Sequence, residues 1–573
     1  MDLFKGCIQY TMIPKRLTKA RRGSFVACDP LPDSPPPTVG KRRDRGLQTG
    51  PLRFHHGLLT VLSIAALAVV LPRAVASSGV GSQDQLAALQ MLQRIQAEAT
   101  SNSRLMETAS WLADVFGPRL ANSPSYDASV EWARHRLETF GVDAAVEPYG
   151  EFGVTWRNEY TSVHMLQPRY MPVIAYPNTW SSGLEGRTRA PAVHLDHAAL
   201  TSIADLEPYR GQLDGAVVLV APLQLIELQF EAPAERLSAA SLAELAAPDL
   251  AAPEREEERD EPVSWDAFVD FVFDQGAVAL AAPDGRESYG NVLVNEVPGR
   301  AWLSAADIHP PFLVLAAEHY NRMVRILDKG VEVELELDVR IAIDELSRQD
   351  TNVIAEIPGS DLAEQVVMLG AHLDANSAGQ GAIDNAGSAA TVMEVMRVLR
   401  AIGLQPRRTI RMALWGGEEY GLVGSRRYVE QVFGGAGGIP SNEAHERFAI
   451  YFNKDGGSGR VRGVYLQENA ALAPLATAWL EPLASFGVVN ISNHANFNSD
   501  QASFDRAGLP SMMFIQDPLE RRGYHTNMDT YDHLYEPDLI QSAIVIASLV
   551  AQAAMSDEAV PRSLPMTARG HRE

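Results

Sequence analysis

Residues 366–421 decide the fold, and they read VVMLGAHLDANSAGQGAIDNAGSAATVMEVMRVLRAIGLQPRRTIRMALWGGEEYG. The apolar runs 366–371 and 409–415 are typical of buried strands, and residues 388–402 between them place apolar side chains at helical spacing. Strand, helix and strand in this order predict a parallel pair with a right-handed crossover. We therefore expect an α/β fold whose central sheet is mostly parallel and flanked by helices.

Side chains that can do chemistry follow each of these predicted strands. His372 and Asp374 come after the first strand, Asp384 precedes the helix, and Glu418 and Glu419 come directly after the second strand. In an open α/β sheet, ligands gather beyond the carboxyl ends of the strands. We therefore expect these five side chains to share one crevice.

Two later residues extend the pattern. Asp455 follows another predicted strand, residues 448–452, and His525 lies in the polar segment 523–529. Two imidazoles and three carboxylates suit zinc, although manganese and cobalt accept the same donors. Two metal ions about 3.5–4 Å apart can acidify a bridging water and polarise a carbonyl, and hydrolysis of an amide needs both effects. The candidate metal ligands are His372, Asp384, Glu418 or Glu419, Asp455 and His525.

The order of these residues resembles the co-catalytic di-zinc exopeptidases, a family of zinc aminopeptidases and carboxypeptidase Q-like enzymes. That family has His-x-Asp, a bridging Asp in a Gly- and Asn-rich turn, Glu-Glu, an Asp after the next strand and a late His. Every one of these positions is filled between residues 372 and 529. Residues 116–124, which read FGPRLANSP, resemble the early segment of the family more weakly. One departure is residues 385–387, NAG, where carboxypeptidase Q-type chains often carry a second acidic residue.

The resemblance implies two Zn²⁺ ions. Asp384 would bridge them, His372 and Asp455 would complete one site, and Glu419 and His525 would complete the other. Asp384 precedes a predicted helix, so an N-cap role is expected beside metal binding.

The resemblance also implies roles in catalysis. Glu418 would be the general base that takes the proton of the water and delivers it to the leaving amine. Asp374 would orient the imidazole of His372. Asp500 is expected either to line the substrate pocket or to make hydrogen bonds at the surface. Tyr524 is expected to offer its phenol to the tetrahedral intermediate.

The implied function is hydrolysis of terminal peptide bonds in short peptides or dipeptides by a metal-bridged hydroxide. Aminopeptidase and dipeptidase or carboxypeptidase activity both remain open, because the residues that read a free amine or carboxylate are not identified. Two alternatives remain. The protein could be a non-catalytic, receptor-like homologue of the same fold, or a glutaminyl cyclase-like acyltransferase with one zinc. The complete ligand set together with Glu418 favours hydrolysis.

Residues 1–76 differ from the rest of the chain. Basic runs, the apolar stretch 57–71 and a small-x-small exit at residues 74–76 predict a secretory signal that is cut after Ala76. A retained membrane anchor is the alternative, although the stretch is shorter than the roughly 20 residues of a transmembrane helix. An exported protein, periplasmic or secreted, is expected. Both cysteines, Cys7 and Cys28, lie in this leader, so no disulfide framework is expected after it.

The rest of the chain changes character twice. Short β-rich runs gather between residues 175 and 340, and the Ala- and Glu-rich stretch 232–262 interrupts them. The charged run 254–261 within it is typical of a solvated helix or loop. The predicted organisation is a leader (1–76), the N-terminal part of the catalytic domain (77–174), a β-rich protease-associated insert (175–340), the zinc peptidase catalytic domain (341–558) and a tail (559–573).

The charge of the chain bears on its partners. The net charge is −23, and residues 1–76 carry 12 Lys and Arg against 4 Asp and Glu, so the acidic excess lies after the leader. Nucleic acid is excluded as an expected partner, because binding to phosphates requires a basic face. A peptide substrate is expected, oligomers are possible, and membrane association is expected only if the leader is retained.

Overall fold

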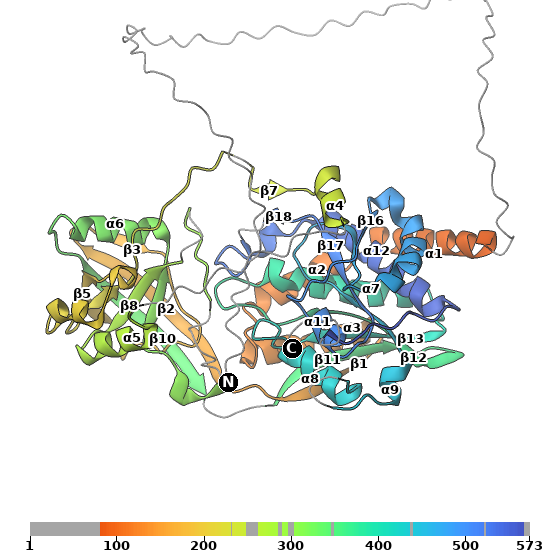
Figure 1. Cartoon of the computed structure of the whole chain (residues 1–573), viewed down its shortest axis with the longest axis horizontal. Helices are drawn as coiled ribbons and strands as arrows, with labels where there is room; N and C mark the ends of the chain where they lie inside the picture. Colours follow the sequence, from red (N-terminus) through yellow and green to blue (C-terminus); the bar gives the residue numbers. More distant parts are fainter. Residues whose placement is uncertain are drawn as a thin grey trace, which may run out of the picture. The chain divides into compact units, whose positions relative to one another are not determined.

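The computed structural model describes residues 81–230, 232–247, 262–284, 289–295, 303–344, 349–435, 439–520 and 523–566. The predicted leader, with its apolar run 57–71, lies outside the described residues, as do the charged run 254–261 and the end of the predicted tail. Residues from Ser82 onward belong to one unit, which contains two eight-stranded sheets (Figure 1).

The first sheet has a parallel centre, and the strands on each side of it, β11 and β15, run the opposite way, although β15 is parallel to the edge strand β16. The predicted unit of strand β12, helix α7 (Gly387–Ala401) and strand β13 is confirmed as a parallel pair with its connecting helix. β12–β14 and β14–β17 are also parallel, whereas β1–β11, β11–β13 and β15–β17 are antiparallel. In sheet order the strands are β1 (Asp143–Glu151), β11 (Gln349–Ile357), β13 (Arg408–Trp415), β12 (Leu362–His372), β14 (Phe448–Asn453), β17 (Ser511–Gln516), β15 (Val461–Tyr465) and β16 (Asn490–Ser492).

The prediction of a mostly parallel sheet is therefore wrong outside the centre, and the sheet is mixed. The chain reverses between β11 and β12 within residues 358–361. A connection this short has no room for the crossover that a parallel pair needs, so β11 runs against the central strands.

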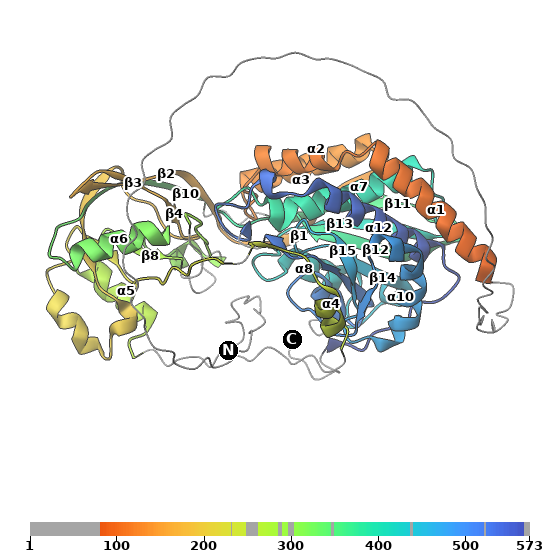
Figure 2. The same cartoon turned by 90° about the horizontal axis from the view of Figure 1, so that it is seen from above.

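The central strand β12 is buried on both faces. Val367 and Leu369 belong to one core, and Met368 between them belongs to another, as the period of two in a strand requires. Figure 2 shows that several helices cover one face of this sheet, and each of them contributes side chains to the first core. These helices are α1 (Gly81–Ser101), α2 (Leu105–Ser110), α3 (Pro124–Thr139), α7 and α12 (Glu536–Met555); α8 (Val423–Val432) and α11 (Gln501–Arg506) line the second core.

Helix α12 alone, among the described residues, is long and apolar enough to cross a membrane. Its apolar window is 83% buried inside the protein. Its hydrophobicity is thus that of a core helix, packed against α7 and the first sheet.

The second sheet is also layered. α5 (Trp265–Asp274) packs on one face through Phe268 and Val272, and α6 (Ala317–Leu327) packs on the other through Tyr320 and Val324. The apolar runs expected near residues 216–221, 277–281 and 311–315 are strands β6, β8 and β9. In sheet order the strands are β3 (Met171–Val173), β2 (Thr155–Gln167), β10 (Glu334–Asp344), β5 (Thr188–His194), β6 (Val217–Leu219), β8 (Ala279–Pro283), β9 (Phe312–Leu315) and β4 (Ala175–Pro177). Assignment of this region to the protease-associated type stays a prediction.

Candidate metal centre

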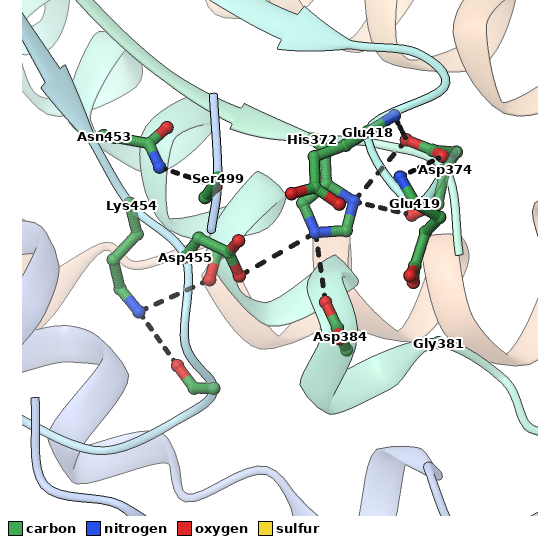
Figure 3. Close-up of polar contacts among 12 residues, drawn as sticks. His372, Asp374, Gly381, Asp384, Glu418, Glu419, Asn453, Lys454, Asp455 and Ser499 are labelled. Atoms are coloured by element: carbon green, nitrogen blue, oxygen red, sulfur yellow. Dashed lines mark hydrogen bonds and ion pairs between the residues drawn. The ribbon is translucent and has the colours of Figure 1, made fainter. Parts of the chain in front are cut away.

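His372 is the last residue of β12 and is fully buried. Its Nδ1 donates to the main-chain oxygen of Asp374 at 3.0 Å. This bond fixes the ring and turns Nε2 toward two carboxylates, with Oδ1 of Asp384 at 3.0 Å and Oδ1 of Asp455 at 3.8 Å (Figure 3). Asp455 lies two residues after the end of β14, so two neighbouring parallel strands bring these side chains to one point.

Asp384 is the centre of the arrangement. Its Oδ1 faces His372, and its Oδ2 lies 3.2 Å from Nε2 of His525. It sits in an irregular turn, residues 382–386, just before α7, with backbone angles that no helix has (φ −124°, ψ 87°). One carboxylate thus faces an imidazole on each side.

The second imidazole belongs to His525, whose Nε2 also lies 3.0 Å from Oε2 of Glu419. Glu419 follows β13, and its other oxygen, Oε1, is buried without a hydrogen-bond partner among the described residues. The ligand atoms of His372, Asp384 and Asp455 lie within 4.8 Å of one another, and the same holds for Asp384, Glu419 and His525. The five expected ligands therefore form two groups that share Asp384.

Asp374 is buried, and its carboxylate holds the turn after β13. Oδ1 accepts a hydrogen bond from the backbone N–H of Glu418 at 3.2 Å, and Oδ2 accepts one from that of Glu419 at 3.3 Å. Asp374 was expected to orient His372. In the structure its main-chain oxygen accepts from Nδ1 of that imidazole and its Oδ1 lies 3.5 Å from the same nitrogen, as the orienting role requires, and its side chain also holds the Glu-Glu turn.

Several carboxylates lie close together in the site, and their negative charges raise the pKa values of the neighbouring groups. Burial alone would lower the pKa of His372, but the charge of Glu418 and hydrogen bonds to the nearby carboxylates raise it well above its usual value. The pKa of His525 is raised in the same way by Glu419 and Asp384, against the effect of burial. Burial raises the pKa of Glu418 well above its usual range, and the neighbouring carboxylates add to the effect. A bound cation would relieve this crowding and would replace the protons on the imidazoles.

Comparison with known proteins identifies this region. Residues 352–550 match the family described as "Peptidase family M28". This segment therefore resembles the M28 peptidases. Carboxypeptidase Q of Xenopus laevis is 25% identical over 253 residues, which cover 44% of this chain and 52% of the relative. The match thus spans about half the length of that curated relative. The resemblance predicted from the motif order is confirmed at the level of the family.

Two solved structures share the fold. The Peptidase M28 precursor from Shewanella amazonensis superposes with a TM-score of 0.61 at 21% identity, over 84% of this chain and 99% of that chain. A zinc aminopeptidase from Bacillus subtilis superposes with a TM-score of 0.51 at 19% identity, over 80% and 96%. Both comparisons extend beyond residues 352–550, the segment that matches the M28 family.

The two remaining sequence candidates lie near the ligands. Asp500 is fully buried, so the reading of a surface hydrogen-bonding group is wrong. Burial raises its pKa to about 7, partly opposed by the charge of His372. Tyr524 precedes His525, and its hydroxyl lies against Gly457, two residues after Asp455. A Cβ on Gly457 would come within 2.6 Å of that hydroxyl, so only glycine leaves room for the phenol there.

Sequence reasoning missed Arg119, which lies outside the M28-like segment 352–550 yet supports the site in it. The side chain is fully buried and donates to four backbone carbonyls. Three of these, at 2.7–3.0 Å, belong to the segment between His372 and Asp384, and the fourth belongs to Leu112. The FGPRLANSP motif carried the signal, but a local motif does not reveal partners more than 250 residues away.

Asp529 and Lys454 were also missed. Oδ2 of Asp529 accepts a hydrogen bond from the backbone N–H of Asp384 at 3.1 Å, and Oδ1 accepts one from that of Ile383. Lys454 is buried beside Asp455 and donates from Nζ to the carbonyl of Gly457 at 2.8 Å (Figure 3). Burial lowers the pKa of Lys454 to about 7. Lys454 stands next to the expected ligand Asp455, and Asp529 stands four residues after His525 in the polar segment 523–529, and this proximity was the available signal.

Proposed function

We propose that this chain is a zinc-dependent exopeptidase that hydrolyses terminal peptide bonds of short peptides or dipeptides. The observation that carries the proposal is the pair of ligand groups that share the carboxylate of Asp384. Nitrogen and oxygen donors in this number suit two Zn²⁺ ions. The M28 match supports peptides as the substrate class.

The residues present fit two such ions. His372 and Asp455 would hold one ion, Glu419 and His525 would hold the other, and Asp384 would bridge them. The buried and unpartnered Oε1 of Glu419 is an oxygen for which a cation would provide a partner. Such ions would polarise the scissile carbonyl and acidify a water molecule.

Glu418 is the proposed general base. It is buried beside the ligands but belongs to neither ligand group, so its carboxylate remains available to exchange a proton. Its raised pKa favours retention of the proton that it takes from water until the leaving amine accepts it. Asp374 holds the backbone of Glu418 and Glu419 in place. Tyr524 would stabilise the tetrahedral intermediate, and Asp500 would adjust the charge around it.

The rival functions predict different metal contents. A glutaminyl cyclase-like acyltransferase would use one zinc, and a receptor-like homologue would need none. Recognition of an amino or a carboxyl terminus stays open, and so does the choice between aminopeptidase and carboxypeptidase or dipeptidase activity. Export to the periplasm or medium is proposed from residues 57–76, which lie outside the described part of the chain.

The test is metal analysis of the purified full-length chain, with dipeptides and aminoacyl anilides assayed on the same sample. Two zinc ions per chain and cleavage that a chelator abolishes are expected, and the substrate panel reports which terminus is recognised. One zinc with cyclisation of N-terminal glutamine would favour the acyltransferase. A folded chain that neither binds zinc nor cleaves any substrate would contradict the proposal.

A further inference from the structure

His525 is held differently from the other ligands. His372, Glu419 and Asp455 end or follow strands of the first sheet, whereas His525 lies in the loop 517–529 between β17 and α12. Its backbone is left-handed (φ +56°), a conformation that a non-glycine residue keeps only when its surroundings impose it. The position of this imidazole therefore depends on what holds the loop.

One set of contacts comes from residues 289–295, which lie between β8 and β9 of the second sheet. The backbone N–H of Val294 donates to the carbonyl of His525 at 3.1 Å. Leu293 and Thr526 form an antiparallel bridge. The segment thus binds the backbone of the ligand itself and of the residue after it.

Asn527 completes this contact with both backbone and side chain. Its N–H donates to the carbonyl of Val292 at 3.1 Å, and its Oδ1 accepts from the N–H of Val292 at 2.7 Å. Its Nδ2 donates to the carbonyl of Gly290 at 3.2 Å. Three hydrogen bonds therefore fix a residue two positions from His525.

A second set of contacts holds the other end of the loop. β7 (Ala234–Glu235), from the segment that joins β6 to α5, pairs with β18 (Leu519–Glu520), as Figure 1 shows. Arg236 donates from one guanidinium nitrogen to the buried carboxylates of Asp517, at 2.8 Å, and Asp538, at 2.6 Å. The N–H of Leu237 donates to Asp517 at 3.0 Å.

We infer that these two segments position His525, with Asn527 and Arg236 as positioning residues. Residues between strands of the second sheet would then set the metal affinity of the Asp384–Glu419–His525 group, while the His372–Asp384–Asp455 group depends mainly on the first sheet. The inference rests on the proposed function, since it requires that both groups bind metal. Groups that orient a metal ligand are typically worth about 10–100-fold in metal affinity.

The test is a calorimetric titration of the metal-free, full-length chain with Zn²⁺. Two binding events are expected for the wild type. Asn527→Ala is expected to weaken one event by about 10- to 100-fold and to leave the other unchanged. The matched control is Asn321→Ala. Asn321 makes a similar pair of bonds to a backbone, accepting from the N–H of Gln224 at 2.9 Å and donating to its carbonyl at 2.8 Å, but it lies in α6. Both events should be unchanged in the control.

Arg236→Ala is the second variant, and it covers the case in which Asn527→Ala does not fold. The Arg236 side chain is 43% exposed, so its removal opens no cavity, and the same single event should weaken. If the folded variants bind Zn²⁺ in two events with wild-type affinities, or if both events are weakened equally, the inference is overturned and the proposed function stands. A wild-type chain that binds no zinc would overturn both.

Discussion

The two sheets are built alike but differ in what their parallel strands deliver. In the first sheet, β12 ends in His372, and Glu418 and Asp455 lie in the turns that follow β13 and β14. β6, β8 and β9 in the second sheet are followed by Val220, Asp284 and Ala316. Both candidate metal groups among the described residues lie at the first sheet. Parallel strands provide a common edge, and the side chains placed there decide whether that edge becomes a site.

The second sheet differs also in how it contributes to the site. It contributes backbone contacts to the loop of His525 rather than ligands. The first sheet thus supplies the residues proposed to take part in chemistry, and the second sheet supplies residues that hold one of them in place.

The largest effect is expected from Glu418→Gln. The amide cannot accept a proton, so turnover should fall by about 10²- to 10⁴-fold while the zinc content stays at the wild-type value. His372→Ala should lose zinc affinity as well as turnover. Steady-state kinetics and metal analysis of the two variants check this. Normal turnover by Glu418→Gln would remove the proposed role of that residue.

A large loss of stability is expected from Arg119→Met. Four backbone carbonyls would lose their donor, and each buried unsatisfied group costs about 1–3 kcal/mol, so the free energy of unfolding should fall by at least about 3 kcal/mol. Urea unfolding measures the change. The control is Arg210→Met in the second-sheet region, because Arg210 is exposed and pairs with Glu207 at the surface. Equal midpoints for the two variants would contradict the supporting role of Arg119.

A matched pair of core leucines sharpens the comparison of the sheets. Leu369 in β12 and Leu280 in β8 are both fully buried, so each change to alanine should cost roughly 2–5 kcal/mol. The zinc affinity of the His372–Asp384–Asp455 group should fall only in Leu369→Ala, because Leu369 lies three residues before His372 on the same strand. Urea unfolding and zinc titration of both variants test this. A similar loss of zinc affinity in Leu280→Ala would show that the two sheets are not separable in this way.

The smallest effect concerns pH. Burial raises the pKa of Asp350 in β11 to about 7, above the value that it has in the unfolded chain, although a hydrogen bond from Tyr149 at 2.6 Å opposes the shift. The stability that this group contributes is present below about pH 4 and is lost as the pH rises through about 7. Over pH 5–7 this should lower the free energy of unfolding by roughly 2 kcal/mol.

Asp350→Asn should remove that part of the pH dependence, because the amide does not titrate. Urea midpoints at pH 5, 6 and 7 measure it for both chains. An unchanged slope in the variant would mean that another group carries the dependence.

Much of the site follows from the sequence because its parts are local. Apolar runs of strand length predict β12, β13 and β14, and the expected ligands His372, Glu419 and Asp455 lie at the carboxyl ends of these strands or in the turns that follow. The carboxyl ends of neighbouring parallel strands must meet, so these three residues had to converge. The order of these residues, read through the family resemblance, predicts the five ligands and Glu418, and the structure brings the five ligand side chains together around Asp384.

The tertiary structure alone decided how the site is supported. Arg119 reaches carbonyls more than 250 residues away, Asn527 binds Gly290 and Val292, and Arg236 binds Asp517 and Asp538. The reversed strands β11 and β15 of the first sheet and the burial of Asp500 likewise appear only once the chain has packed. Periodicity and strand ends are properties of a few adjacent residues, so one sequence reveals them. A hydrogen bond between distant segments depends on how whole elements dock, and no local pattern encodes that.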